Sequence, residues 1–282
     1  MIKRILFSLL LFSAGNNAFS QTDLFPHTKS KWVDSVMKSL SVDQKIGQVL
    51  MPRGNTNITY DTARLYEIVR KYHVGGFVLF AGYPTNQARL VNKLQALSKV
   101  PLFIGMDLEW GLNMRLDSTV RYPYQMTLGA MQGNDALIEK MGFQIAQQCK
   151  RMGIHVNFAP VIDINNNPNN PVINYRSFGE DPENVSKKGW AYAKGMQDAG
   201  IIACAKHFPG HGDTDVDSHK DLPVIHHTLE RLREVEFKPF EYLIDKGIMS
   251  VMTAHLFIPA IDDRKNMAMS ISDKAINGIL RQ

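Results

Sequence analysis

The segment from Lys206 to His219 concentrates the residue types that perform acid–base chemistry. It reads KHFPGHGDTDVDSH, so one lysine, three histidines and three aspartates stand among three turn-forming glycine and proline residues. The apolar run 201–205 comes directly before it. A buried strand that ends in a glycine-rich loop with titratable groups is how a rigid scaffold presents catalytic side chains. The pattern therefore predicts an active-site loop.

Asp217 and His219 in this loop are separated by a single residue. In an extended or turn conformation the carboxylate can accept a hydrogen bond from one imidazole nitrogen, which leaves the other nitrogen to face a substrate. Such a pair tunes the histidine for general acid–base catalysis. In isolation, an Asp-x-His sequence more often belongs to a solvated loop. Its position among the other titratable residues favours the catalytic interpretation.

Two other kinds of site are open to the same loop. Its metal-ligand types are His207, His211, Asp213, Asp217 and His219. Against a metal site, the adjacent lysine would oppose a cation and the chain has no His-Glu-x-x-His pattern. A phosphate site is weaker still because no Gly-x-x-x-x-Gly-Lys-Ser/Thr sequence is present. We therefore expect no metal and no cofactor.

The elements that position this loop alternate between helical and strand patterns. We expect helices from 41 (a capping box), and over 61–72, 85–97, 134–152, 185–199, 229–246 and 272–281. We expect strands near 46–51, 74–80, 101–106, 154–164, 201–205 and 248–253. Nearly continuous apolar strands between helices indicate a parallel sheet that is buried on both faces. A (β/α) barrel and an open doubly wound sheet both fit this pattern.

The polar residues that follow the expected strands favour the barrel. They are Asp107 and Glu109, Asp163, Lys206 with His207, and His255. In a barrel the carboxyl ends of all strands meet at one mouth, whereas an open sheet binds ligands at one switch point. We predict an α/β fold of the (β/α)8 TIM-barrel type with about six βα units. Because the sequence stops inside a predicted helix, we expect the barrel to be incomplete at its C-terminus.

The first twenty residues predict export. Two basic residues, an apolar run over 5–12 and small residues at Ala18 and Ser20 form the layout of a signal peptide, and the run is too short to span a membrane. We expect a periplasmic or extracellular protein whose barrel domain covers 21–282. Without Lys3 and Arg4 the formal net charge falls from +5 to +3.

Composition adds two expectations. No long basic run is interleaved with aromatic residues, so a nucleic-acid partner is not favoured. Cys149 in an expected helix and Cys204 in an expected strand stand in apolar surroundings. We interpret them as buried thiols rather than a disulfide.

Taken together, the motifs resemble glycoside hydrolase family 3, in its N-acetyl-β-glucosaminidase branch. The resemblance extends from about Ser41 to Arg281. The motifs that carry it are KHFPGHGDT at 206–214 with DSH at 217–219 and LP at 222–223, DLE at 107–109 with Arg115, NFAPVID at 157–163, NYRSFG at 174–179, and MTAH at 252–255.

This resemblance implies a TIM-type barrel that removes terminal β-linked N-acetylglucosamine with retention, through a covalent intermediate. It implies that His219 is the general acid–base and that Asp217 supports it. The implied substrates are peptidoglycan fragments or chitin-like oligosaccharides. The residues implied in substrate binding are Asp107, Arg115, Arg176, Lys206 and His207.

The chain departs from the family pattern at two places. The family usually has Gly-Gly after the Asp-x-Glu, whereas Trp110 precedes Gly111 here, and it either stacks on a sugar face or fills the mouth. The family nucleophile is an aspartate after the strand that follows the 272–281 helix, and the sequence ends at Gln282. We therefore expect the chain alone to be nearly inactive. The alternatives are a β-glucosidase of the same family, a non-catalytic sugar-binding fragment and a metal-dependent hydrolase.

Overall fold

Six parallel strands form the centre of the structure, and each pairs with the strand that follows it in the chain. The computed structural model describes residues 30–57, 61–216 and 221–282. Within these residues the sheet order is β1-β2-β3-β4-β5-β6. The strands are β1 (Arg53–Thr56), β2 (Gly76–Gly82), β3 (Phe103–Met106), β4 (Val156–Asn157), β5 (Ile202–Phe208) and β6 (Ser250–Thr253).

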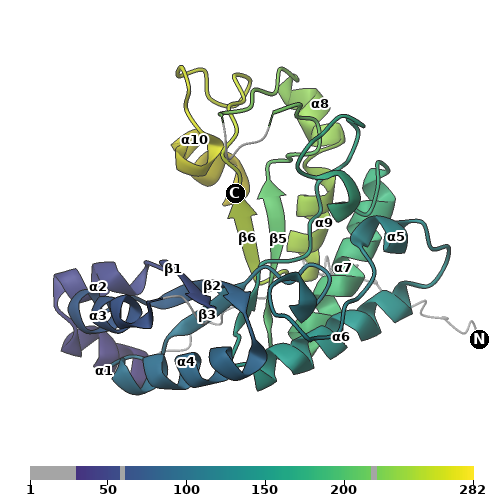
Figure 1. Cartoon of the computed structure of the whole chain (residues 1–282). Helices are drawn as coiled ribbons and strands as arrows, with labels where there is room; N and C mark the ends of the chain where they lie inside the picture. Colours follow the sequence, from purple (N-terminus) through teal and green to yellow (C-terminus); the bar gives the residue numbers. More distant parts are fainter. Residues whose placement is uncertain (1–29, 58–60, 217–220) are drawn as a thin grey trace, which may run out of the picture.

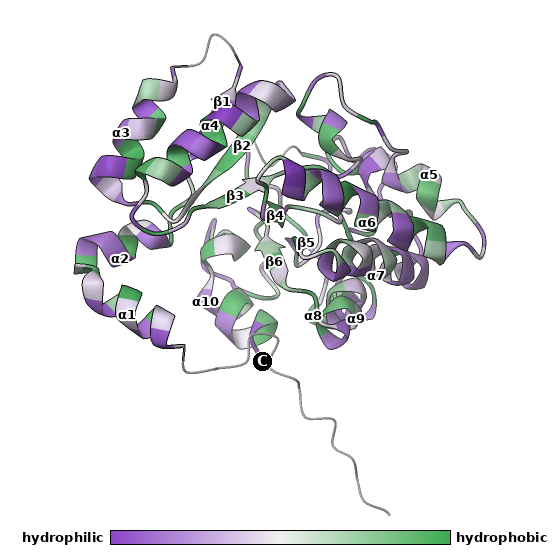
Figure 2. Ribbon diagram, turned by 90° about the horizontal axis from the view of Figure 1, so that it is seen from below, coloured by the Kyte–Doolittle hydropathy of each residue, from purple (hydrophilic) through white to green (hydrophobic). Residues whose placement is uncertain are grey.

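This strand order distinguishes a barrel from an open sheet. A doubly wound sheet reverses its order at a switch point, whereas barrel strands follow one another around a ring. The described strands show no reversal, and every pairing between them is parallel. In Figure 2 the helices lie around the strands. The predicted α/β fold of the TIM-barrel type is confirmed.

Helices cover the outer side of the curved sheet (Figure 1). Among the described helices, none combines the length and the apolar character that a membrane span requires. The α-helices are α1 (Lys31–Ser39), α2 (Val42–Gln48), α3 (Thr62–Tyr72), α4 (Pro84–Leu97), α5 (Gln125–Gly129), α6 (Asp135–Arg151), α7 (Pro182–Asp198), α8 (Leu229–Glu234), α9 (Lys238–Lys246) and α10 (Asp273–Ala275). Short 3-10 turns are η1 (Leu112–Met114), η2 (Asn174–Arg176) and η3 (Met269–Ile271), and the π-helical turn η4 (Ile276–Leu280) follows α10.

The strand predicted near 46–51 is wrong. Helix α2 occupies Val42–Gln48, and the first strand begins at Arg53. The capping box between Ser41 and Gln44 fixes the start of α2, because the side chain of each residue accepts a hydrogen bond from the backbone N–H of the other. The capping box therefore sets a helix where the apolar residues that follow it suggested a strand.

The predicted helix over 229–246 divides into α8 and α9. Pro239 stands in the first turn of α9, where a proline is tolerated because that N–H has no helical partner. The same residue would interrupt a continuous helix by removing a hydrogen bond. Glu236 in the break is buried and accepts hydrogen bonds from Arg231 and Asn166.

The strand observed in the region 154–164 is shorter than the predicted one. Only Val156–Asn157 pair with neighbouring strands as β4.

The hydrophobic core lies between the strands and the covering helices. Phe77 and Leu79 of β2 and Ile104 and Met106 of β3 are buried, and β2 is green along its length in Figure 2. The two thiols also behave as predicted. Both are free and buried. Burial raises the pKa of Cys149 to about 12 and that of Cys204 to about 11, so neither is a reactive thiolate at neutral pH.

Candidate active site

A cavity of about 610 Å³ opens at the carboxyl ends of the strands. It is lined by Asp107 after β3, by Lys206 and His207 of β5, and by His255 after β6. Small-molecule sites typically enclose about 300–1,000 Å³ and combine an apolar lining with a few placed polar groups. The convergence of these residues at one mouth, predicted from their positions after the strands, is confirmed.

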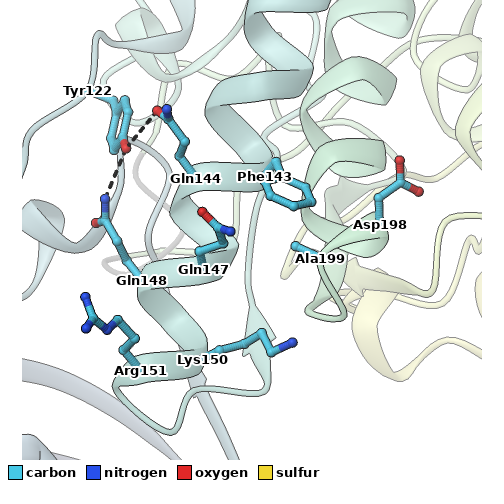
Figure 3. A pocket seen from close by; sticks show the side chains of 9 residues that line it. All are labelled: Tyr122, Phe143, Gln144, Gln147, Gln148, Lys150, Arg151, Asp198 and Ala199. Carbon is cyan, nitrogen blue, oxygen red and sulfur yellow. Dashed lines mark hydrogen bonds between the residues drawn. The ribbon is translucent and has the colours of Figure 1, made fainter.

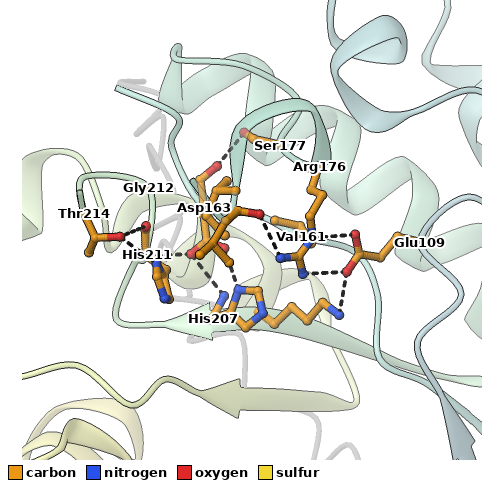
Figure 4. A network of polar contacts seen from close by, with 12 residues as sticks. Glu109, Val161, Asp163, Arg176, Ser177, His207, His211, Gly212 and Thr214 are labelled. Atoms are coloured by element: carbon orange, nitrogen blue, oxygen red, sulfur yellow. Dashed lines mark hydrogen bonds and ion pairs between the residues drawn. The ribbon is translucent and has the colours of Figure 1, made fainter. Parts of the chain in front are cut away.

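The bottom of this cavity is an ionic floor made of Asp107, Glu109, Arg115, Arg176 and Lys206. The ammonium of Lys206 lies 2.9 Å from Asp107 Oδ1 and 2.8 Å from Glu109 Oε1. Arg176 holds Glu109 in a bidentate pair, with Nε 2.9 Å from Oε2 and Nη2 2.7 Å from Oε1 (Figure 4). Arg115 Nη2 lies 3.0 Å from Asp107 Oδ2. The floor is therefore one connected network from three separate chain segments.

These pairings keep the buried groups of the floor ionised at neutral pH. Burial alone would raise the pKa of Glu109, but Lys206 and Arg176 outweigh it and lower the pKa to about 2. Burial likewise opposes charge on Lys206, and the carboxylates of Glu109 and Asp107 nevertheless raise its pKa. A buried charge that is paired and hydrogen-bonded on both sides persists, whereas an unpaired one would neutralise.

Asp163 holds His207 from behind the floor. The carboxylate is fully buried, with Oδ2 2.7 Å from His207 Nδ1 and Oδ1 accepting from the backbone N–H groups of His207 and His211 (Figure 4). Burial lowers the pKa of His207 despite the carboxylate, so the ring is neutral at pH 7. Because an ionised carboxylate only accepts, Nδ1 carries the proton. Nε2 is then an acceptor without a partner among the described residues.

The described charges at the cavity and directly behind it are equal in number. In residues 30–57, 61–216 and 221–282 they are three cations and three carboxylates, namely Arg115, Arg176, Lys206, Asp107, Glu109 and Asp163. A site that demanded a phosphate or carboxylate would carry surplus cations, and a cation site would carry surplus carboxylates. The arrangement suits an uncharged polar ligand. Arg115 Nε is buried and has no hydrogen-bond partner in the described part of the chain.

Asn170 fixes the loop that follows β5. Its side-chain amide donates to the carbonyls of His211 and Gly212 at 2.8 and 2.9 Å and to the hydroxyl of Thr214 at 3.2 Å. Gly212 is required there because a Cβ would lie 1.6 Å from the carbonyl oxygen of Ile164. The base of the predicted active-site loop is therefore fixed against the neighbouring loop. Asp217 and His219 lie outside the described residues, and their acid–base role stays a prediction.

The structure brings together the five residues predicted to bind substrate, and it adds partners that sequence reasoning did not assign. Glu109 is the buried centre of the floor, and its only sequence signal was its place two residues after Asp107. Asp163 was noted after a strand but given no role. Asn170 lies between two of the quoted motifs, and no pattern in the sequence assigned it a role. The donors of Arg176 are directed largely at Glu109 and the Val172 carbonyl, so its contact with substrate stays a prediction.

A second cavity of about 850 Å³ lies on the outside of the barrel, along α6 (Figure 3). Its wall carries Tyr122, whose hydroxyl lies between the amides of Gln144 and Gln148 at 3.4 and 3.1 Å. It is larger than the cavity at the strand ends but has no network of paired acids and bases. We place the active site at the strand ends, because catalytic groups of barrels stand there.

The described residues offer no support for the metal site considered from the sequence. In residues 30–57, 61–216 and 221–282, no three His, Cys, Asp or Glu side chains are grouped so that they could hold a metal ion. Two of the ligand types considered from the sequence, Asp217 and His219, lie outside those residues.

Comparison with known proteins identifies relatives for most of the chain. The pattern of the glycosyl hydrolase family 3 N-terminal domain matches residues 41–282. Beta-hexosaminidase A from Pseudoalteromonas piscicida is 36% identical over 253 residues, which cover 80% of this chain and 42% of that protein.

Two solved structures resemble the fold closely. A glycoside hydrolase family 3 beta-N-acetylglucosaminidase from Paenibacillus sp. str. FPU-7 has a TM-score of 0.77 at 38% identity and covers 86% of this chain and 47% of that one. The beta-glucoside phosphorylase BglX bound to 2FGlc has a TM-score of 0.84 at 27% identity, with 91% of this chain and 48% of that one covered. The chain thus spans less than half the length of each of these three proteins.

Proposed function

The chain belongs to glycoside hydrolase family 3, and from this membership we propose that it forms the sugar-binding barrel of a retaining β-N-acetylhexosaminidase. The observation that carries the proposal is the connected ionic floor at the strand ends, in which every charged side chain is paired with another. Relatives that are named hexosaminidase and N-acetylglucosaminidase support the choice of N-acetylglucosamine as the terminal sugar.

The floor would bind a sugar by orientation rather than by charge. Lys206 and Arg115 only donate hydrogen bonds, Asp107 only accepts, and neutral His207 offers an acceptor at Nε2. Because these groups hold one another, they need little reorganisation when a sugar hydroxyl replaces water. Fixed partners of both kinds hold a polyol in one pose and so lower the entropic part of the barrier.

In this proposal His219 protonates the leaving oxygen and then deprotonates the attacking water, with Asp217 as its partner. Asn170 and Gly212 set the base of their loop, which supports the assignment because an acid–base group must be held within hydrogen-bond reach. Retention also requires a carboxylate nucleophile. We assign that role to no residue of 1–282.

The substrates we propose are peptidoglycan fragments or chitin-like oligosaccharides, encountered after export. The N-terminal layout of the sequence supports export. N-terminal sequencing of protein secreted by an expressing cell tests it, with Gln21 as the expected first residue. A mature protein that still began at Met1 would contradict export.

A β-glucoside-processing enzyme is the second candidate, because the BglX phosphorylase is a close structural relative. Hydrolysis of an aryl N-acetyl-β-glucosaminide and an aryl β-glucoside by the full-length protein separates the two. We expect a preference for the N-acetyl substrate, and loss of that activity in His219→Ala. A preference for the glucoside would overturn the proposed substrate class.

Calorimetry tests the floor directly. N-acetylglucosamine should bind more tightly than glucose, and Lys206→Met should weaken binding at least about tenfold, since it leaves two buried carboxylates without their shared cation. Lys187→Met is the matched control, because Lys187 pairs with Glu183 on the exposed face of α7. Equal effects of the two substitutions would contradict the sugar-binding floor.

A further inference from the structure

Three aromatic side chains form one side of the same cavity, and we call Trp110, Tyr124 and Tyr175 the aromatic wall. Trp110 and Tyr175 line the cavity. Tyr124 packs against both, with ring centroids 4.9 Å from Trp110 and 4.5 Å from Tyr175, and the Trp110 and Tyr175 centroids are 6.3 Å apart. Edge and tilted contacts of this kind stabilise a cluster and fix its rings.

The backbone holds the two lining rings in place at a conformational cost. Gly111 follows Trp110 with φ +84°, and a Cβ there would lie 2.6 Å from the ring of Tyr122. Asn174 precedes Tyr175 with φ +39°, in the left-handed region that non-glycine residues rarely adopt. Strained positions of this type gather at functional sites. The rings are thus presented by a specific local structure rather than by a relaxed loop.

The two lining residues of the wall belong to pieces of chain that also contribute to the ionic floor. Glu109 and Trp110 are neighbours in sequence, as are Tyr175 and Arg176, and the bidentate Glu109–Arg176 pair joins the two pieces. The solvent exposure of the side chains increases from the floor to the wall. Glu109 is fully buried, whereas Tyr175 is 46% exposed. The wall therefore lies nearer to solvent than the floor does.

The polar tips of the wall are available. Neither the indole N–H of Trp110 nor the hydroxyl of Tyr175 has a hydrogen-bond partner within the described part of the chain, and neither atom is buried. An aromatic ring that is partly exposed, rigidly held and equipped with a free polar tip matches a pyranose ring. The axial C–H groups of a sugar stack on the ring face while its hydroxyls reach the polar tip. Arg121 stacks on the ring of Tyr124 and donates to its hydroxyl, so this cation at the wall is directed at the ring that does not line the cavity.

We propose that the aromatic wall binds a second pyranose ring, the one to which the terminal sugar is β-linked. The inference rests on the proposed function, in which the buried floor holds the terminal sugar. The next ring of the chain must then lie toward solvent, where Trp110 and Tyr175 stand. Such a binding site would favour oligosaccharides over glycosides that have a small aglycone.

Two ligands that differ only in the second ring test the proposal on the chain itself. They are methyl 1-thio-N-acetyl-β-glucosaminide and a β-1,4 di-N-acetylchitobioside with a sulfur in the glycosidic bond. The sulfur linkage resists hydrolysis in both. Affinities are measured by calorimetry, and binding near Trp110 by tryptophan fluorescence, since the sequence has only three tryptophans. We expect the disaccharide to bind more tightly and to change the fluorescence more than the methyl glycoside does.

Substitutions in the wall should remove only this advantage. Trp110→Ala and Tyr175→Ala should each weaken disaccharide binding about three- to tenfold and change methyl glycoside binding less than about twofold. Trp32→Ala is the matched control, because Trp32 is 59% exposed on α1 and away from the cavity. Thermal melting confirms that each variant is folded, and the exposed Tyr175 gives a second test if Trp110→Ala does not fold.

The outcomes separate the wall from the floor. Equal affinity of the native chain for the two ligands, or an equal loss for both ligands in the wall variants, would overturn the second-sugar site and leave the proposed function intact. Failure of the native chain to bind either ligand would overturn both. Loss of both ligands in Lys206→Met, together with loss of the disaccharide advantage alone in the wall variants, supports both.

Discussion

Glu109 and Arg176 are 67 residues apart in the chain and form the most completely buried bidentate pair of the site, with contacts of 2.9 and 2.7 Å. Glu109 is inaccessible to solvent and also contacts Lys206, so one carboxylate holds two cations. This carboxylate therefore stabilises the floor without reaching a ligand itself. We assign it a positioning role, and we expect its removal to affect both folding and the proposed sugar binding.

Glu109→Gln should destabilise the protein by about 3 kcal/mol, because a buried ion pair that loses one partner leaves an uncompensated charge. Urea unfolding measures the loss. Glu183→Gln is the control: its exposed pair with Lys187 should contribute less than about 1 kcal/mol. Similar losses in the two variants would contradict the importance of burial.

The same carboxylate gives a pH dependence with a defined sign. Its pKa falls from 4.5 to about 2 on folding, so the unfolded chain binds the proton more tightly. The stability it provides is complete above about pH 4.5 and is lost as the pH falls toward 2, by about 3 kcal/mol in all. Unfolding free energies of the native protein and Glu109→Gln should therefore converge over this range. Parallel curves would show that Glu109 is not held as an ion.

Asn170→Asp should loosen the loop at 209–216. The carboxylate keeps the acceptor for Val172 and Ile173 but loses the donors that hold His211 and Gly212. We expect a destabilisation of about 1–3 kcal/mol and faster amide exchange in the loop. Asn167→Asp, on an exposed turn, is the control and should change neither. Unchanged exchange in both variants would show that Asn170 does not hold the loop.

Thiol reactivity checks the core. Cys149 and Cys204 are buried and burial raises the pKa of both, so an aromatic disulfide reagent at pH 8 should leave the native protein unmodified. In denaturant both thiols should react. Rapid modification of the folded protein would mean that α6 or β5 opens readily.

The sequence sufficed for the features that depend on local pattern. Strands followed by polar residues predicted that Asp107, Lys206 and His207 would meet, because parallel strands bring their carboxyl ends to one edge. The hydrogen-bond partners of the individual side chains could not be predicted in this way. Asn170 meets His211 across 41 residues, and no local pattern encodes such a contact. The strand predicted near 46–51 is wrong for a different reason. The capping box of Ser41 and Gln44 is a local signal for a helix, and this helix includes the first residues of the predicted strand.

The pairing of charges in the floor limits how this surface can change. Arg176 and Lys206 are each matched to carboxylates from another segment, so a single substitution of Glu109 or Arg176 leaves an unmatched charge in a buried place. Substitutions of Glu109 and Arg176 should therefore be tolerated only when both residues change together. Because the described charges at the site are paired with one another, affinity for a sugar should also depend little on ionic strength, in contrast to sites that attract phosphates. Large changes in salt concentration should therefore leave the proposed sugar binding nearly unchanged.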